Sequence, residues 1–268
     1  MVAGKFRVER LIGQGGMGAV YAAEHLILRQ RVALKLVVGE ASARDEVVRR
    51  FFDEARAASL IQSEHIARVI DVGRTETGVL YMVLEYLEGA DLARLARDER
   101  IPAAAVVDYV LQALDALAHA HALGVVHRDL KPANIFLARA PDGTARIKVL
   151  DFGISKLGQL SLAPSAATAT AAVMGSPTYM SPEQIKSAKK VDARADIWSI
   201  GVVLYELLTG VKPFDGETWG ELFAAILQQA PLPPTAHDPS IPPALEAAVL
   251  RCLEREPSNR FADVGELA

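Results

Sequence analysis

The chain has 268 residues, 51% of them hydrophobic, so it can bury a substantial core as one larger domain or two small lobes. Its formal net charge of −4 gives no basic excess for binding nucleic acid or an anionic membrane. The single cysteine, Cys252, excludes an intrachain disulfide and is typical of a reducing compartment. No secretory signal is recognisable, and the most apolar run, residues 197–210, is too short to span a bilayer.

The predicted elements change character near residue 90. Before it, strands are predicted within 6–38, a helix over 44–61 and two further strands within 68–85. After it, helices are predicted over 103–123, between Pro102 and Gly124, and over 192–209, ended by Gly210. A short β region with a turn at 142–143 and a non-periodic stretch at 154–181, expected to be a mobile loop, separate these helices.

This order predicts an α+β fold with two lobes. We expect a small β-rich lobe over about residues 1–86, containing one main helix, and a larger helical lobe over about residues 87–268. The hinge between them is expected within residues 85–92.

A glycine cluster, "LIGQGGMGAVY", lies between the first two predicted strands. Gly13, Gly15 and Gly18 would let the backbone approach a phosphate closely. A dinucleotide-binding turn needs a helix directly after the glycines, and here a strand follows, so that interpretation is excluded. A glycine-rich hairpin without a ligand explains this stretch equally well.

Lys35 and Glu54 are candidate partners in the first lobe. Lys35 lies within a predicted strand, where a lysine most often extends its ammonium to water. Glu54 lies on the otherwise apolar face of the predicted helix, and an acid facing a core needs a partner. The two residues could form a purely structural ion pair, or Glu54 could orient Lys35 toward nucleotide phosphates.

The stretch "HRDLKPANIF", residues 127–136, displays polar side chains from a loop through which Pro132 prevents a helix from running. Asn134 and, after an apolar strand, Asp151 offer oxygen ligands to Mg²⁺. Asp129 could then orient a hydroxyl nucleophile, and Lys131 could neutralise charge on a transferred phosphoryl group. Each residue alone is more simply a surface polar group, and the ordered set is what favours chemistry.

Taken together, these motifs resemble those of eukaryotic-type protein kinases, and most closely the bacterial Hanks-type serine/threonine kinases. The resemblance runs from about Phe6 to the end of the chain. It is carried by "GQGGMG" at 13–18, "VALK" at 32–35, Glu54, "HRDLKPAN" at 127–134, "DFG" at 151–153, "GSPTYMSPE" at 175–183, "DIWSIG" at 196–201 and "PSNRF" at 257–261.

The resemblance implies ATP and Mg²⁺, or Mn²⁺, as cofactors. Lys35, paired with Glu54, would bind phosphates, Asp129 and Lys131 would be catalytic, and Asn134 and Asp151 would bind metal. Leu84 would be the gatekeeper beside adenine, and Glu85 and Leu87 would offer it backbone hydrogen bonds. The nucleotide would further contact Ile12, Gly13, Gly15, Gly18, Val20, Ala33 and Leu137, of which Val20, Ala33 and Leu137 would enclose the ring.

Regulation is also implied by the resemblance. Arg128 before Asp129 is typical of kinases controlled by loop phosphorylation, and Thr168 and Thr170 match autophosphorylation sites. The alternative is that these threonines are ordinary small polar residues of a flexible linker. Ser176 stands where the family usually has threonine, whose hydroxyl bridges the catalytic Asp and Lys. Arg260 is expected to pair with Glu183.

The implied function is phosphorylation of serine or threonine in protein substrates, with Lys131 matching that class rather than the tyrosine class. A pseudokinase scaffold that binds nucleotide is an alternative, although all five catalytic positions are filled. A small-molecule kinase of the aminoglycoside-phosphotransferase type would lack a segment like "GSPTYMSPE".

We expect the chain to be the cytoplasmic catalytic domain of a longer protein, which a membrane span could anchor, with no membrane contact within this segment. A homodimer formed through the small lobe could support activation in trans. His119, His121 and Cys252 are expected to be packing residues rather than ligands.

Overall fold

The structure is a computed structural model that describes residues 1–15, 18–37, 45–139, 143–152, 177–186 and 191–268. The chain divides into two compact units. Unit 1 comprises Met1–Gln62, Ala67–Glu88 and the segment that starts at Asp151, and unit 2 comprises Ser63–Ile66, Gly89–Leu150 and the chain from Ser176 onward.

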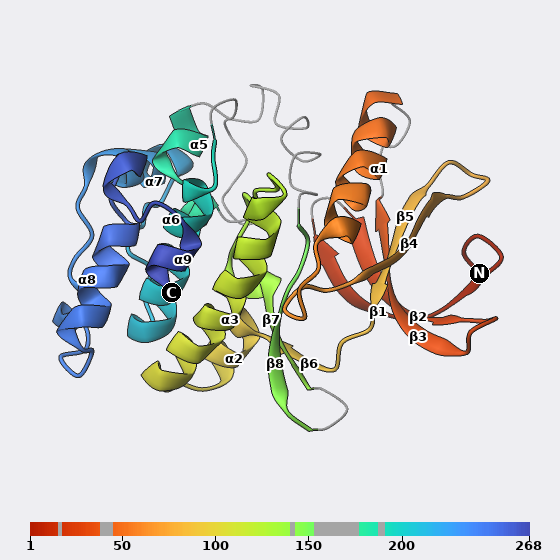
Figure 1. The fold of residues 1–268 in the computed structure, drawn as a ribbon, viewed down its shortest axis with the longest axis horizontal. Helices are drawn as coiled ribbons and strands as arrows, with labels where there is room; N and C mark the ends of the chain where they lie inside the picture. The colour runs from red at the N-terminus through yellow and green to blue at the C-terminus, as the bar shows by residue number, and fades with distance from the viewer. Residues whose placement is uncertain (16–17, 38–44, 140–142, 153–176, 187–190) are drawn as a thin grey trace. The chain divides into compact units, whose positions relative to one another are not determined.

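Unit 1 is built on a five-stranded antiparallel sheet (Figure 1). Its strand order is β1-β2-β3-β5-β4. The strands are β1 (Phe6–Gly15), β2 (Gly18–His25), β3 (Gln30–Val37), β4 (Val69–Arg74) and β5 (Leu80–Glu85). The first three strands are joined consecutively, so the glycine cluster lies in the β1–β2 hairpin and is followed by a strand, as the sequence predicted.

The two faces of this sheet bury different clusters because successive side chains of a strand point to opposite sides. Helix α1 (Asp45–Leu60) packs on one face, where its Val47, Phe51 and Ala55 meet Val37, Leu80 and Met82. On the other face the buried cluster consists of Phe6, Ala23, Val32, Leu34, Tyr81 and Val83. Val47 and Phe51 therefore belong to the apolar helix face predicted from their spacing.

Unit 2 is mainly helical and contains a small sheet of strand order β6-β7-β8. The strands are β6 (Gly89–Asp91), β7 (Ile135–Arg139) and β8 (Ala145–Val149). The helices are α2 (Leu92–Asp98), α3 (Ala103–Ala122), α5 (Pro182–Lys186), α6 (Arg194–Thr209), α7 (Trp219–Gln228), α8 (Pro243–Cys252) and α9 (Val264–Leu267), with short 3₁₀ turns at Pro132–Asn134 and Pro177–Tyr179.

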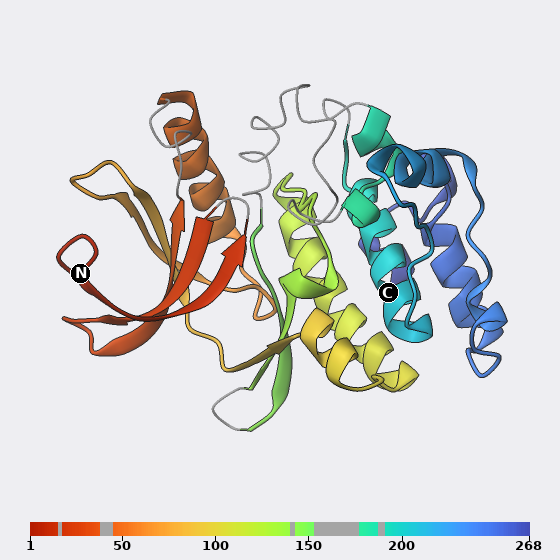
Figure 2. The same cartoon turned by 180° about the vertical axis from the view of Figure 1, so that it is seen from behind.

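Helix α6 lies between α3 and α8 and is the core of unit 2 (Figures 1 and 2). It is buried on all sides from Ala195 to Tyr205, as expected for a helix that is apolar all round. It ends at Gly210, whose φ of 79° is the left-handed conformation that glycine adopts readily. Helix α3 is long and apolar enough by composition to cross a membrane, but its Val106, Val110 and Leu117 are buried in this core.

The structure confirms the predicted α+β class, with a β-rich unit containing one main helix and a larger helical unit. Strand β6 and helix α2 were not predicted. Strand β6 has three residues and exists through its pairing with the distant β7, while α2 is capped by Asp91, whose carboxylate accepts from the Arg94 N–H. The predicted loop at 154–181 lies largely outside the described residues.

Candidate active site

One face of the unit 1 sheet gathers most of the predicted nucleotide-binding residues. Gly13 is opposite Val20, and Val20 is opposite Lys35, in one cross-strand row. Ala33 and Leu84 are paired in the next row on the same face. Residues directly opposite one another in antiparallel strands share a face of the sheet. The hairpin connections thus bring together residues that the sequence separates by about 70 positions, and Lys35 is 8% exposed.

The glycines of the β1–β2 hairpin serve different needs. Gly15 and Gly18 form its last pair, and residues 16–17 between them lie outside the described chain. Gly18 has φ of 149°, and a Cβ there would lie 1.9 Å from the Leu36 carbonyl oxygen, so β3 itself requires glycine. A Cβ on Gly13 would meet only Val20, at 3.9 Å. Ile12 lies at a register shift between Leu11 and Gly13 and is 40% exposed.

The Lys35 ammonium bonds a different carboxylate from the one predicted. Its Nζ donates to Asp151 Oδ1 at 2.7 Å, whereas the sequence predicted Glu54, which is half-buried, as its partner. The Lys35–Glu54 pair therefore stays a prediction, and the contact that the structure shows for this ammonium is the one with Asp151. Within unit 1, Asp151 adopts the left-handed conformation, with φ of 60°, and presents its Oδ1 to the ammonium.

In unit 2, Asp129, Lys131 and Asn134 form one hydrogen-bonded cluster. Lys131 Nζ donates to Asp129 Oδ2 at 2.9 Å. Asn134 Nδ2 donates to the Asp129 carbonyl oxygen at 2.7 Å and to its Oδ2 at 3.2 Å. The 3₁₀ turn Pro132–Asn134 returns the chain so that these side chains meet. The Asp129 carboxylate remains partly exposed at 39%, which leaves it accessible to a substrate group.

A buried aspartate holds the backbone that leads into this cluster. Asp196, on α6 and fully buried, accepts from the backbone N–H groups of His127 and Arg128, each at 2.8 Å. His121 Nε2 lies 2.8 Å from the same carboxylate. Arg128 has φ of 68°, an unfavourable conformation for a side chain with a Cβ, so the charge-assisted bonds from Asp196 offset local strain.

The His127 ring further fixes the loop. Its Nε2 lies 2.7 Å from the Leu150 carbonyl oxygen, which can only accept, so Nε2 carries the proton. Its Nδ1 accepts from the Asp129 N–H at 3.3 Å. The fully buried His127 side chain therefore ties the backbone of the catalytic-loop candidate to Leu150, the residue just before Asp151.

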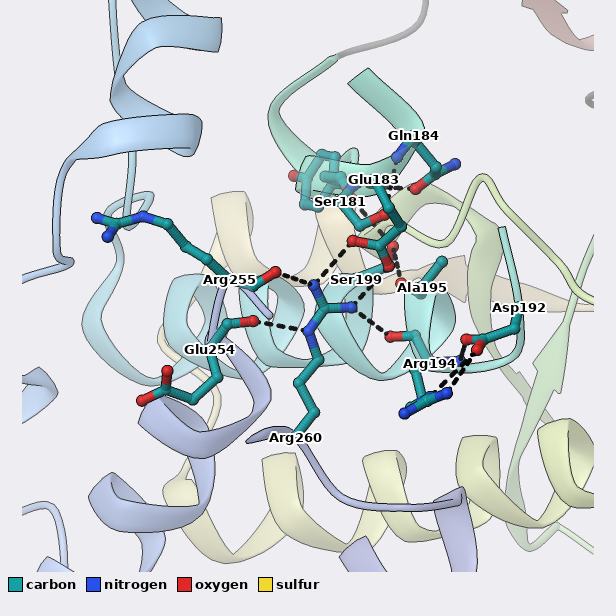
Figure 3. A network of polar contacts seen from close by, with 11 residues as sticks. Ser181, Glu183, Gln184, Asp192, Arg194, Ala195, Ser199, Glu254, Arg255 and Arg260 are labelled. Carbon is teal, nitrogen blue, oxygen red and sulfur yellow. Dashed lines mark hydrogen bonds and ion pairs between the residues drawn. The ribbon is translucent and has the colours of Figure 1, made fainter. Parts of the chain in front are cut away.

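The predicted Arg260–Glu183 pair is confirmed and lies at the centre of a larger network (Figure 3). Arg260 binds both Glu183 oxygens, at 2.7 and 2.8 Å, and donates to three carbonyl oxygens, those of Glu254, Arg194 and Arg255. All five N–H donors of its guanidinium are thereby satisfied. The guanidinium also lies over the Trp198 ring, 5.1 Å from its centroid.

The short helix α5 links this network to the catalytic loop. Its first turn is a capping box in which Ser181 N–H donates to Gln184 Oε1 and Gln184 N–H donates to Ser181 Oγ. Gln184 Nε2 in turn donates to the Arg128 carbonyl oxygen at 2.9 Å. Glu183, between them in the chain, is the Arg260 partner.

Comparison with known proteins is consistent with this arrangement. The family model of the protein kinase domain matches residues 6–265. The chain belongs to the protein kinase domain family. Its fold is that of a kinase domain: over its full length it matches the crystal structure of the PknI kinase domain from M. tuberculosis, with a TM-score of 0.76, 27% identity and 94% of that chain covered.

Curated relatives of this kinase domain carry serine/threonine-kinase names. It is 42% identical over 261 residues to serine/threonine-protein kinase Pkn1 of Myxococcus xanthus, and 40% identical over 264 residues to serine/threonine-protein kinase pkn3 of the same organism. Each match covers 97% of this chain but only 37% and 48% of the respective relative. The chain thus spans less than half the length of these relatives.

Of four further predicted site residues, the structure describes Leu137, and the other three lie outside the described residues. Leu137 pairs with the fully buried Ile147, so it shares a face of the small sheet with Ile135 and Val149, which also pair and are fully buried. The residue that faces the opposite side is Phe136, which was not predicted although strand alternation indicates it. Thr168, Thr170 and Ser176 lie outside the described residues.

The three expected packing residues differ in what they do. Cys252 is fully buried, and burial raises the pKa of its thiol to about 12, as expected for a packing residue. His119 is bonded to the Asp115 carbonyl oxygen, one turn back in α3. His121 was described incompletely, because its ring is a partner of the buried Asp196 carboxylate and not only a packing element.

Proposed function

We propose that this kinase domain transfers the γ-phosphoryl group of ATP, with Mg²⁺, to serine or threonine hydroxyls of protein substrates. The observation that carries the proposal is the Asp129 cluster, in which Lys131 and Asn134 both bond the same carboxylate. Their hydrogen bonds fix the direction of Asp129, and the exposed part of its carboxylate can accept the hydrogen bond of a substrate hydroxyl.

Unit 1 supplies the nucleotide face in this proposal. Val20, Ala33 and Leu84 provide its apolar rows and Lys35 its positive charge. Within the described residues, Leu87 makes no backbone hydrogen bond, which leaves its N–H and C=O for the base. In unit 2 we assign Phe136, rather than Leu137, to the nucleotide side, since Leu137 shares the face of the fully buried Ile135.

Asn134 and Asp151 have the donor chemistry that Mg²⁺ prefers. Within the described residues, Asn134 Nδ2 donates both of its hydrogen bonds to Asp129, so Oδ1 is the amide atom that is left to bind a metal. Asp151 offers a carboxylate that is 34% exposed. A bound Mg²⁺ would neutralise charge that develops on the phosphate oxygens. The residues themselves orient the phosphates through Lys35, orient the hydroxyl through Asp129 and stabilise the transferred group through Lys131.

Loop phosphorylation is proposed as the regulatory step. Arg128 Nε is buried and has no hydrogen-bond partner within the described residues, so an additional acceptor would satisfy it. A phosphate on Thr168 or Thr170 supplies such an acceptor and a negative charge. A Thr168→Ala/Thr170→Ala double variant is expected to lose loop phosphate by mass spectrometry and most of its activity. Full activity without loop phosphate would exclude this step.

The wider assignments are proposals of the same kind. Protein substrates and signalling follow the serine/threonine-kinase names of the relatives. We further propose that the domain is the cytoplasmic part of a longer, membrane-anchored protein and that two copies activate one another in trans. A scaffold without catalysis remains the alternative, and the intact Asp129 cluster favours an active enzyme over it.

A transfer assay tests the proposed function. The chain is incubated with labelled ATP, Mg²⁺ or Mn²⁺, and a generic basic protein, beside the Asp129→Asn variant. Incorporation on serine or threonine is expected for the wild type, and a rate about 10²- to 10⁴-fold lower for the variant. Binding of nucleotide without transfer would instead identify a scaffold, and equal transfer by the variant would exclude the assigned role of Asp129.

A further inference from the structure

Two arginines and a tyrosine lie at one end of the nucleotide face. They belong neither to the buried core clusters nor to the residues proposed for catalysis. Tyr86 follows β5, in the linker of residues 86–88 at the end of the Ala67–Glu88 segment of unit 1. Arg10 Nη2, from β1, donates to Tyr86 Oη at 3.0 Å. The Arg31 guanidinium, from β3, lies 5.8 Å from the centroid of the Tyr86 ring. This distance is within the range of a cation–π contact.

The strand register places all three residues on the face that carries Lys35. Val32 is opposite Glu85, so the next position along each strand puts Arg31 beside Tyr86. Arg10 is opposite Ala22, and Ala22 is opposite Ala33, in the row that ends at Leu84. The two alanines leave room for the arginine side chain to reach from β1 to the linker. The register shift between Val8 and Arg10 sets the face of the sheet to which the Arg10 side chain points, since bulges commonly redirect a side chain.

The residue before Tyr86 is held in a separate way. The Glu85 N–H donates to the Arg68 carbonyl oxygen at 3.0 Å, and the Arg68 N–H donates to Glu85 Oε1 at 3.0 Å. Glu85 and Tyr86 are therefore both fixed to the sheet, whereas the backbone groups of Leu87, one residue further, make no hydrogen bond within the described chain.

We propose that Arg10 and Arg31 are positioning residues that hold Tyr86 and thereby preset the Leu87 backbone for the nucleotide base. The inference rests on the proposed function, because it concerns how that site binds its base. A chance surface contact is the competing explanation. A chance contact would not be expected to join β1 and β3 to the linker at Tyr86, the residue directly before Leu87.

The test measures binding of MgADP to the full chain by titration calorimetry. Arg10→Met and Tyr86→Phe each remove the same hydrogen bond, and each is expected to raise the dissociation constant about three- to fivefold. The double variant is expected to bind as each single variant does, since both lose one shared contact. Arg10→Lys, which can still donate to the phenol oxygen, is expected to bind within about twofold of wild type.

Kinetics and a matched control separate positioning from general stability. Arg7→Met removes another β1 arginine, whose partner is Glu24 on β2 and not the linker, and is expected to bind MgADP as wild type does. In the transfer assay Arg10→Met is expected to raise KM for ATP while kcat changes less than about twofold.

The outcomes distinguish the two proposals. Wild-type protein that neither binds MgADP nor transfers phosphate would reject the proposed function. Three other outcomes would overturn only the positioning role. The first is that Arg10→Met and Tyr86→Phe bind MgADP as tightly as the wild type does. The others are additive effects in the double variant, or a lower thermal midpoint with unchanged affinity.

Discussion

Arg260 in unit 2 and Lys35 in unit 1 are both buried cations beside a carboxylate, but they differ in how many partners fix them. Arg260 is 2% exposed and places all five of its N–H donors on oxygens of four residues. Lys35 is 8% exposed, and its ammonium bonds one carboxylate, that of Asp151, among the described residues.

The difference indicates which charge supports the fold and which can change partners. Breaking the Arg260 network would leave a partly buried Glu183 and three carbonyl oxygens without their donor, which is costly in a low-dielectric interior. The Asp151 side chain is already 34% exposed, so water can solvate its carboxylate when Lys35 is released, and the cost in stability is small. An ammonium that bonds a single carboxylate among the described residues can exchange that partner for a phosphate or for Glu54. Stability and proposed catalysis are therefore expected to respond to different cations.

The largest expected effect is that of Arg260→Met. The variant should lower the free energy of unfolding by about 3–5 kcal/mol, because it removes one partner of a buried ion pair. Urea denaturation followed by circular dichroism measures the change. Combining it with Glu183→Leu should restore part of the stability, since no buried charge then remains unpaired.

A matched control for Arg260→Met is Arg94→Met on α2. Arg94 lies 3.8 Å from Asp98, and both side chains are mostly exposed, so its loss should change the unfolding free energy by less than about 1 kcal/mol. Equal stability of the two variants would contradict the prediction that the Arg260 network stabilises the fold much more than an exposed ion pair does.

The second prediction concerns Lys35→Met, which should separate activity from stability. The rate of phosphate transfer should fall about 10²- to 10³-fold, because the positive charge that orients the phosphates is lost. The unfolding free energy should change by less than about 1 kcal/mol, since Asp151 is partly hydrated. Labelled-ATP transfer and urea denaturation measure the two quantities, with Lys5→Met, which loses an exposed contact to Asp71, as the control. Destabilisation as large as that of Arg260→Met would remove the distinction between the two cations.

Local patterns were sufficient to predict much of this molecule. The spacing of Val47 and Phe51 predicted the packed face of α1, and Gly124 and Gly210 marked the ends of α3 and α6. The residues of the Asp129 cluster were predictable because they lie within six positions of one another, on a turn that Pro132 constrains. The Arg260–Glu183 pair came from the family resemblance and not from spacing.

The features that were missed depend on contacts between distant segments. Asp196 and His121 are 75 positions apart, and nothing in either local sequence indicates that helix packing brings them together. Likewise, Lys35 and Asp151 are 116 positions apart, and choosing between Asp151 and Glu54 as its partner requires three-dimensional distances. The short β6 is stabilised by its partner strand rather than by its own three residues.

The smallest expected effect distinguishes two glycines of the β1–β2 hairpin. Gly13→Ala should raise the unfolding free energy by up to about 0.5–1 kcal/mol, because alanine loses less conformational entropy in a strand and its Cβ would meet Val20 at an ordinary 3.9 Å. Its affinity for MgADP should nevertheless fall, since the added methyl group would lie on the nucleotide face. Gly18→Ala is the contrasting variant: its Cβ would overlap the Leu36 carbonyl at 1.9 Å, so stability itself should decrease. Thermal unfolding and calorimetry of both variants measure these changes. A loss of stability in Gly13→Ala would mean that the sheet requires glycine at position 13, as it does at Gly18, and would contradict a role for Gly13 in binding the phosphates.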